Sequence, residues 1–199
     1  PIALPAWKLA PALVSGNTVV LKPASQAPAM ALELARAFDE AGLPAGVLNV
    51  VVGSGKEVGD ELANHATVQA LSFTGSHGVG HSIYQQLAPR MTRAQMEMGG
   101  KNPTIVLADA DLDDAATCCV NLRMLVSGQV CVSPKRLIAV DAIYDAFEKR
   151  VVERAQAFHP ADPTHAETKL GPLARADLRD TLHEQVQRSI ADGARSLLG

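Results

Sequence analysis

The chain lacks the cysteine content that would mark a disulfide-rich or zinc-binding protein. Its 199 residues include three cysteines, Cys118, Cys119 and Cys131, with no Cys-x-x-Cys pair. An odd number of cysteines, two of them adjacent, is a poor disulfide framework, because neighbouring residues bridge only with strain. A reducing compartment, with the cytoplasm as the default, fits this pattern better. We also expect no metal site.

Features of nucleic-acid-binding and membrane proteins are also missing. The sequence has no basic cluster to follow phosphates, no apolar run long enough to span a bilayer and no leader of the secretory type. What it does have is 47% hydrophobic residues and a net charge of −3, typical of one large globular domain or two small ones. We therefore expect neither a nucleic-acid nor a membrane partner.

Short β-branched runs alternate with helix-forming segments in the first half of the chain. Pro28 opens a predicted helix over residues 29–41, which Gly42 ends. The predicted strands on either side of it and beyond are residues 18–21, 48–52 and 69–73. This alternation predicts an α/β fold in which a parallel sheet carries helices on its faces. Ligands bind beyond the carboxyl ends of such strands, and the residues there are Lys22, Ser25, Gly53 and Ser76.

The second half continues this alternation. Strands are predicted over residues 104–107 and 136–140, and helices over 112–123, 142–157 and 177–191. Cys118 and Cys119 lie in the first of these helices, where a free cysteine usually packs as a small apolar group. Gly128 is expected to end that helix and to present Cys131 on a loop. We therefore expect Cys131 to be accessible and the other two thiols to be buried.

The sequence contains a candidate base, Glu97, and a candidate nucleophile, Cys131. Glu97 precedes the pair Gly99 and Gly100, and Cys131 follows Gly128. A thiol attacks as the thiolate, so a nucleophilic cysteine needs a base or a positive field. Glu97 has the chemistry to be that base, directly or through a water. We expect an apolar strand over residues 94–98 to bury its carboxylate, which suits it to that role.

A glycine-rich segment follows the strand at residues 69–73. Its glycines, Gly75, Gly78 and Gly80, have the spacing G-x-x-G-x-G, which is not the dinucleotide fingerprint G-x-G-x-x-G. The segment also opens a helix, whose free amides can bind a pyrophosphate. From spacing alone, an ordinary turn and a cofactor loop both remain open.

Two segments resemble the signature runs of the aldehyde dehydrogenase superfamily, in the family's order and at its usual separation. They are Glu97 to Pro103 (EMGGKNP) and Ser127 to Cys131 (SGQVC). The resemblance extends over the whole chain, and it implies an NAD(P)-dependent aldehyde dehydrogenase. In that family the cysteine attacks the aldehyde, hydride leaves to the nicotinamide, and the glutamate activates the water that hydrolyses the thioester. By position, Cys131 is then the nucleophile and Glu97 the base.

The resemblance also implies a domain division and a cofactor site. Residues 1–98 match part of a Rossmann-like NAD(P)-binding domain, and residues 99–199 match part of a second α/β catalytic domain. The family's cofactor loop, Phe-Thr-Gly-Ser, is matched through Gly75 and Ser76, although His77 and Gly78 depart from its usual Thr and Glu. In the family, the lysine that Lys22 matches reaches the adenosine ribose. NAD-preferring members often carry a glutamate where Ser25 stands, so we expect NADP or NAD as cofactor.

Further matches concern the substrate and a proton relay. Lys8 matches a family position implicated in relaying protons from the base, although a lone helical lysine is more often only solvated. Residues 177–186 look like those of succinate-semialdehyde dehydrogenases, and residues 95–103 like those of 2-oxoglutarate semialdehyde dehydrogenases. A dicarboxylic semialdehyde is therefore the expected small-molecule substrate, and a homo-oligomer the expected full-length assembly. Met124 and Val126 depart from an aromatic residue and an asparagine that the family usually has in this run.

Two alternatives to an active enzyme remain. One is a catalytically silent fragment or binding protein that keeps the signatures by descent, and the other is a redox-responsive thiol protein with Cys131 as its sensor. The resemblance further implies that the family's oxyanion asparagine precedes Pro1 and that later catalytic-domain strands follow Gly199. We therefore expect these 199 residues alone not to turn over an aldehyde.

Overall fold

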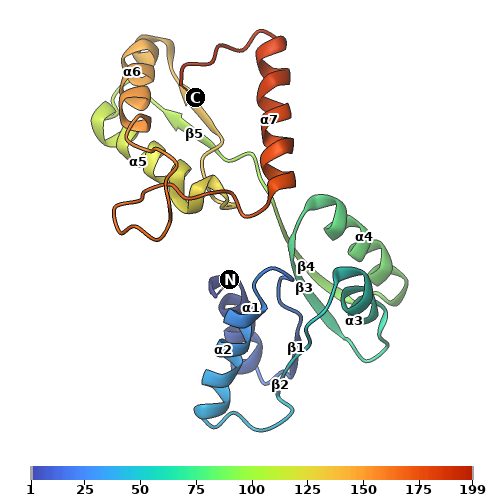
Figure 1. The fold of residues 1–199 in the computed structure, drawn as a ribbon. Coiled ribbons are helices and arrows are strands. Elements are labelled where there is room, and N and C mark those ends of the chain that lie inside the picture. Colours follow the sequence, from blue (N-terminus) through green and yellow to red (C-terminus); the bar gives the residue numbers. More distant parts are fainter. Residues whose placement is uncertain (1, 199) are drawn as a thin grey trace. The chain divides into compact units, whose positions relative to one another are not determined.

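A computed structural model describes residues 2–198, which form two compact units that divide between Gly99 and Gly100 (Figure 1). The strands of both units pair in parallel and are accompanied by helices, so the predicted α/β class is confirmed. Among the described residues the strands form three separate two-stranded ladders. In the first half of the chain, where the alternation predicts a parallel sheet, two of these ladders occur.

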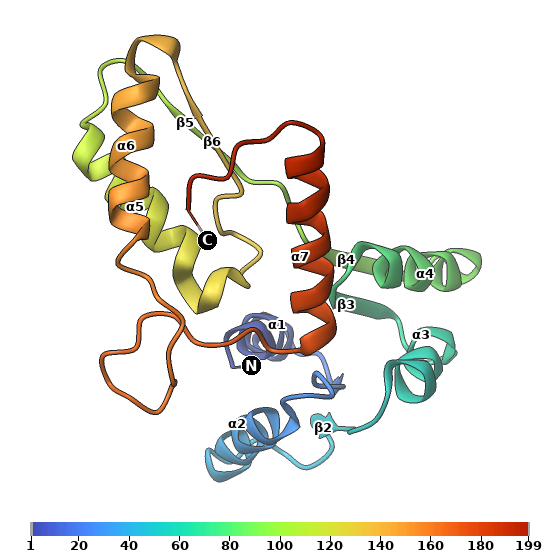
Figure 2. The same cartoon turned by 45° about the horizontal axis from the view of Figure 1, so that its top comes forward.

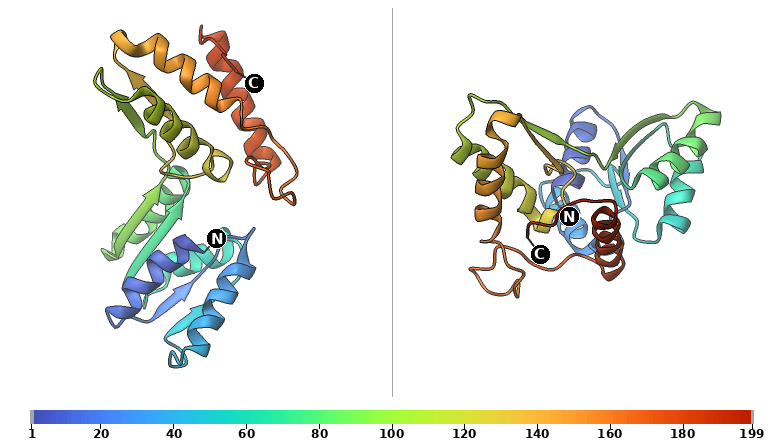
Figure 3. Two further views of the ribbon diagram at one scale, coloured as in Figure 1. Left: turned by 90° about the vertical axis from the view of Figure 1, so that its left-hand side faces the viewer. Right: turned by 90° about the horizontal axis from the view of Figure 1, so that it is seen from above.

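The first unit contains all of the predicted cofactor-binding residues. Its elements are α1 (Ala3–Val14), β1 (Val19–Leu21), α2 (Pro28–Glu40), β2 (Leu48–Val50), the π-helical turn η1 (Gly55–Gly59), α3 (Asp60–Asn64), β3 (Ala70–Gly75), α4 (His77–Leu87), the 3-10 turn η2 (Ala88–Arg90) and β4 (Arg93–Met98). β1 pairs with β2, and β3 pairs with β4 in a register that sets Thr74 beside Glu97. Figure 3 shows α4 running alongside β3 and β4.

The limits of the second helix follow directly from its sequence. Pro28 occupies the first turn of α2, where its missing N–H costs no hydrogen bond. Gly42 adopts a left-handed φ of 85° just beyond the helix end, a conformation that glycine reaches without a steric penalty. Residues 51 and 52 fall outside β2, so that strand is shorter than predicted.

The second unit contains the candidate nucleophile. Its elements are β5 (Pro103–Val106), α5 (Leu112–Met124), the 3-10 segment η3 (Leu125–Gly128), β6 (Arg136–Ala139), the 3-10 turn η4 (Asp141–Ile143), α6 (Tyr144–Ala155) and α7 (Ala176–Ala191). β5 and β6 lie beside each other, and α5 and α6 pack together (Figure 2). Their shared core consists of Val106, Ala116, Cys119 and Phe147.

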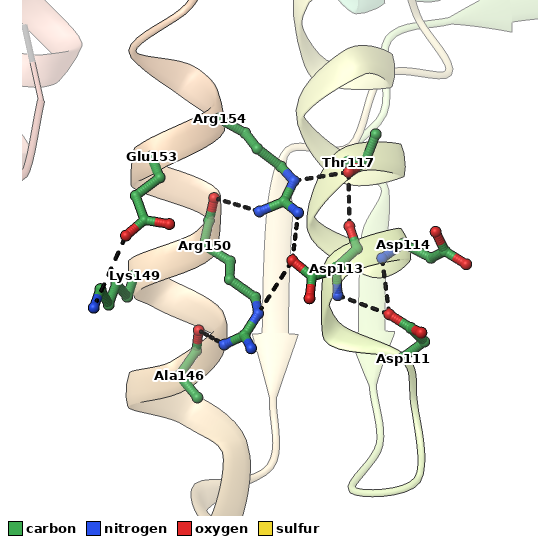
Figure 4. Close-up of polar contacts among 9 residues, drawn as sticks. All are labelled: Asp111, Asp113, Asp114, Thr117, Ala146, Lys149, Arg150, Glu153 and Arg154. Atoms are coloured by element: carbon green, nitrogen blue, oxygen red, sulfur yellow. Dashed lines mark hydrogen bonds and ion pairs between the residues drawn. The ribbon is translucent and has the colours of Figure 1, made fainter.

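Polar contacts also join α5 to α6. The carboxylate of Asp113, in the first turn of α5, accepts a 2.5 Å hydrogen bond from Arg154 and lies 3.4 Å from the guanidinium of Arg150, both on α6 (Figure 4). The Arg154 hydrogen bond lowers the pKa of Asp113 most, with a further contribution from Arg150. Asp111 caps the same helix by accepting from the amides of Asp113 and Asp114. These contacts fix the helix that leads into the Cys131 segment.

No helix in residues 2–198 has the length and apolar character that crossing a membrane requires. The longest described helix, α7, instead presents a row of half-exposed apolar side chains, Leu178, Leu182, Val186 and Ile190.

Candidate active site

Cys131 lies in an irregular turn between α5 and β6, here named the nucleophile turn (residues 125–134). The predicted helix over residues 112–123 agrees with α5, which ends at Met124, and Gly128 lies at the end of the 3-10 segment η3 that follows. Val126, Ser127 and Gly128 then adopt φ values of 51°, 55° and 75°. A left-handed conformation costs a non-glycine residue roughly 1–2 kcal/mol, and the cost is highest for a β-branched residue such as Val126. Because sequence patterns associate this conformation with glycine, the residue types at 126 and 127 did not predict the turn. Such strain is characteristic of functional sites.

Side-chain hydrogen bonds hold the nucleophile turn in this conformation. Arg123 donates to the carbonyl of Gly128 at 3.1 Å, and the hydroxyl of Ser127 donates to the carbonyl of Gly171 at 2.9 Å. The side chain of Gln129 accepts from the amide of Ala174 at 2.9 Å. A Cβ on Gly128 would lie 3.2 Å from the carbonyl oxygen of Arg123, so this position also lacks room for a side chain.

Asn102 joins the two signature segments within the second unit. Its side-chain amide donates to the carbonyl of Cys131, and to that of Ser133 at 3.1 Å. Its own backbone carbonyl accepts from the amide of Lys135 at 3.0 Å. Asn102 therefore holds the backbone at Cys131 and just after it. The sequence interpretation assigned Asn102 no role, because only the tertiary fold brings residue 102 beside residue 131.

The three thiols differ in exposure, and one prediction about them is wrong. Cys131 is exposed and Cys119 is buried, as expected, but Cys118 is exposed. Successive helical residues point about 100° apart, so only Cys119 faces the core that α5 shares with α6. Burial, and secondarily the neighbouring Cys118, raises the pKa of Cys119 and makes it a poor nucleophile.

The candidate base, Glu97, lies in β4 and is exposed, so the expectation that this strand buries it is wrong. Side chains alternate between the two faces of a strand. Ala94, Met96 and Met98 occupy the more covered face, and Met98 packs against α4 near Gly80. Glu97 therefore shares the opposite face with Gln95.

A chain of hydrogen bonds links Lys8 to Glu97 within the first unit. The ammonium of Lys8 donates to the hydroxyl of Ser72 at 2.6 Å, which donates to Gln95 at 2.6 Å. The amide of Gln95 donates to Glu97 at 3.3 Å. Burial lowers the pKa of Lys8, and the charge of Glu97 partly opposes this shift. Lys8 therefore has a hydrogen-bond partner in the protein and is not only solvated. The sequence analysis did not predict the part that Ser72 and Gln95 play in this chain of hydrogen bonds.

The predicted cofactor loop lies at the start of α4. Ser76 is the N-cap residue, but its side chain makes no capping hydrogen bond. The first amides of a helix have no intrahelical partner and can bind an anion. A Cβ on Gly75 would lie 2.4 Å from the ring of Phe73, so close packing requires glycine there. The hydroxyl of Thr74 is buried without a hydrogen-bond partner. These features fit a phosphate-binding loop.

Lys22 and Gly53 lie together at the carboxyl ends of β1 and β2. The ammonium of the half-buried Lys22 donates to the carbonyls of Pro23 at 2.8 Å and Gly53 at 3.3 Å. A Cβ on Gly53 would meet Val58 at 2.4 Å, so this glycine permits a close approach of the chain. Ser25 is exposed.

One pair of histidines has a spacing that the prediction of no metal site did not take into account. His77 and His81 stand four residues apart on α4, and their rings are stacked with centroids 6.3 Å apart. Within residues 2–198, however, no group of three or more His, Cys, Asp or Glu side chains is arranged to hold a metal ion. The pair by itself does not make a metal centre.

The predicted site residues are divided between the two units. Glu97, Lys8 and the cofactor-loop residues belong to the first, and Cys131 belongs to the second. Within the first unit the structure brings Lys8 and Glu97 into one network and sets Lys22 beside Gly53. Within the second it presents Cys131 on a turn held from several sides.

Comparison with known proteins points to one enzyme family. The family model "Aldehyde dehydrogenase family" matches residues 1–199. The chain is 46% identical to an alpha-ketoglutarate semialdehyde dehydrogenase of Haloferax volcanii, and 41% identical to an alpha-ketoglutaric semialdehyde dehydrogenase of Bacillus subtilis. Each match includes 100% of this chain and 41% of the relative. The chain thus spans about two fifths of the length of these relatives.

Solved structures of related enzymes have the same fold. A 3,6-anhydro-L-galactose dehydrogenase in complex with NADP matches with a TM-score of 0.93 and 39% identity, over 99% of this chain and 41% of its own. A betaine aldehyde dehydrogenase of Staphylococcus aureus in complex with NAD+ also matches with a TM-score of 0.93, at 32% identity, over 98% of this chain and 39% of its own.

Proposed function

The chain belongs to the aldehyde dehydrogenase family, and from this premise we propose that the full-length protein oxidises an aldehyde to the carboxylic acid with NADP or NAD. The proposed substrate is a dicarboxylic semialdehyde. Its support is that both curated relatives described above are named for 2-oxoglutarate (alpha-ketoglutarate) semialdehyde. The observation that carries the proposal is the exposed thiol of Cys131 on a strained turn that Asn102 and Arg123 hold in place.

Cys131 is the proposed nucleophile. Its thiolate sulfur bonds to the aldehyde carbon, and the carbonyl oxygen takes the negative charge of the resulting thiohemiacetal. A nicotinamide cofactor, when bound, would supply the acceptor for the hydride that leaves the former aldehyde carbon. A thioester on Cys131 remains. A thiol attacks only as the thiolate, and burial raises the pKa of Cys119, which disfavours its thiolate. Cys131 is exposed, so it suits the role of nucleophile better than Cys119 does.

Glu97 is the proposed base for the second half of the reaction. Its carboxylate takes a proton from the water that attacks the thioester, which releases the acid and restores the thiol of Cys131. Gln95 donates to one oxygen of Glu97 and leaves the other available to a water. The amide of Gln95 does not carry protons onward, so the chain from Lys8 acts by orienting Glu97 and placing a positive charge near it.

The proposed cofactor site uses residues of the first unit. Gly75 and Ser76 would receive the pyrophosphate at the start of α4, where the geometry leaves backbone amides available. Lys22 and Gly53, joined by a hydrogen bond, would form the adenosine-ribose end together with Ser25. No carboxylate stands at residue 25 to repel a 2′-phosphate, which supports the acceptance of NADP as well as NAD.

Assembly and location belong to the same proposal. All three cysteines are free thiols, which supports a reducing compartment, and we propose the cytoplasm. The full-length protein is proposed to be a homo-oligomer. Exposed apolar side chains such as Ile105, Leu107 and Ile138 support contact with further polypeptide.

The test is an assay of aldehyde-dependent NAD(P)H formation. The protein is restored to the full length of its relatives and given 2-oxoglutarate semialdehyde or succinate semialdehyde, with betaine aldehyde as the contrasting substrate. We expect turnover that Cys131→Ala abolishes and Cys118→Ala leaves intact. The 199 residues alone are expected to give no turnover. Activity that survives Cys131→Ala would end the assignment of the nucleophile.

A further inference from the structure

Lys135 occupies an unusual position beside the candidate nucleophile. Its ammonium lies 3.3 Å from the carbonyl oxygen of Val130, 3.2 Å from that of Cys131 and 3.3 Å from that of Ser133. An ammonium has three N–H donors and no acceptor, so three carbonyl acceptors match its full capacity. A surface lysine rarely finds such a set, because ordering its long side chain costs entropy.

The backbone explains why these carbonyls converge. The amide of Ser133 donates to the carbonyl of Val130 at 3.1 Å, which closes a tight turn around Cys131. The amide of Lys135 donates to the carbonyl of Asn102, whose side chain binds the carbonyls of Cys131 and Ser133. Lys135 and Asn102 thus share two of the same acceptors.

We infer that Lys135 is a positioning residue that fixes the turn around Cys131 and adds a positive field to its thiolate. The inference rests on the proposed function of Cys131 as nucleophile. Lys135 acts through backbone carbonyls and the field of its charge, without touching the substrate itself. Arg123 is a second cation that contacts the nucleophile turn, because its guanidinium donates to the carbonyl of Gly128. A cation close to a cysteine favours the reactive thiolate.

The chain contains its own reference thiols for a test. Cys118 is exposed on α5 and reports general alkylation, while Cys119 is buried and reports unfolding. The 199-residue protein is treated with limiting iodoacetamide between pH 6 and pH 9. Peptide mass spectrometry then gives the rate at Cys131 relative to Cys118. Labelling of Cys119 identifies any variant that fails to fold.

Four variants separate charge from hydrogen bonding. Lys135→Met removes both, Lys135→Gln keeps donors without charge, and Lys135→Arg keeps the charge. Lys149→Met is the control, because Lys149 has a side chain 77% exposed on α6 and pairs only loosely with Glu153 at 4.0 Å. We expect Lys135→Met and Lys135→Gln to lower the alkylation rate of Cys131, relative to Cys118, by about threefold at neutral pH. This is the effect of removing one charge several ångströms away in water-like surroundings. Lys135→Arg should keep most of the wild-type alkylation rate at Cys131. Salt at 1 M should reduce the difference in this rate between the wild type and the two uncharged variants, because it screens the charge of Lys135.

Fixing of the turn has its own readout. Amide hydrogen exchange over the nucleophile turn should quicken in Lys135→Met and stay unchanged in Lys149→Met. Equal rates at Cys131 in wild type, Lys135→Met and Lys135→Gln would overturn the inference, and so would an equal loss in Lys149→Met. Failure of the proposed function has a different signature: Cys131 labelling that depends on Lys135, in a full-length protein that turns over no aldehyde.

Discussion

Replacing Gly80 with alanine tests the close packing of α4 on β4, which positions the candidate phosphate loop. Gly80 is buried, and a Cβ built there lies 2.6 Å from the sulfur of Met98 and 3.3 Å from the ring of Phe73. Packed non-hydrogen atoms sit at roughly 3.5–4.0 Å, so Met98 or the helix must move by about 1 Å. Such overpacking typically costs about 1–3 kcal/mol, and the flexible Met98 places this case towards the lower end.

Gly78 provides a matched control on the same helix. A Cβ there meets nothing within 4 Å, and its backbone does not require glycine. Alanine is favoured over glycine inside a helix by up to about 1 kcal/mol, and both variants gain this contribution. Gly78→Ala is therefore expected to stabilise the protein slightly. The free energy of unfolding of Gly80→Ala should be about 1–3 kcal/mol lower than that of Gly78→Ala, because only Gly80→Ala crowds Met98.

Thermal unfolding followed by circular dichroism measures this difference. For a unit of about 100 residues, each kcal/mol shifts Tm by roughly 4–8 °C, so Gly80→Ala should melt at least about 4 °C below Gly78→Ala. A double variant, Gly80→Ala with Met98→Ala, should recover part of the loss by making room. Equal Tm values for the two glycine variants would refute the close contact between α4 and β4.

Three further predictions concern the cofactor and two charged groups. In the full-length protein, Ser25→Glu should lower kcat/KM with NADP relative to NAD by roughly tenfold, because it sets a like charge near the 2′-phosphate; an unchanged ratio would remove Ser25 from the cofactor argument. In carbon-13 NMR of methylated lysines, Lys8 should titrate below the usual lysine pKa, and lower still in Glu97→Gln, which removes the charge that raises it; a rise in that variant would contradict the network. The lowered pKa of Asp113 means that its contact with Arg154 stabilises the fold above the unfolded carboxyl pKa and is lost as pH falls through the folded one. Asp113→Asn should therefore lower Tm at pH 7 but not at about pH 2, and a loss of equal size at both pH values would count against this linkage.

The sequence was sufficient where local chemistry decides the structure. Pro28 and Gly42 set the limits of α2, because caps and turns depend on residues close in the chain. Parallel pairing followed from the alternation of strands and helices. The exposed thiol of Cys131 followed from its place after a glycine.

Tertiary packing decided what the sequence did not predict. A strand has two faces, and which face is covered depends on α4, so the burial of Glu97 was misjudged. The same holds for Cys118, whose helical position alone does not tell which side meets α6. The contact of Asn102 with the carbonyl of Cys131 joins residues 29 positions apart, so no local pattern predicts it.

The proposed mechanism requires that Cys131 forms a thioester and that Glu97 helps to hydrolyse it. The most direct measurement uses the full-length Glu97→Gln protein, mixed with the semialdehyde and NADP or NAD, digested at low pH and analysed by peptide mass spectrometry. Because Glu97→Gln should slow hydrolysis of the thioester but not oxidation of the aldehyde, about one equivalent of NAD(P)H should form in a burst. The Cys131 peptide should gain the mass of the aldehyde less two hydrogens. A burst without that adduct, or with the adduct on Cys118 or Cys119, would contradict it.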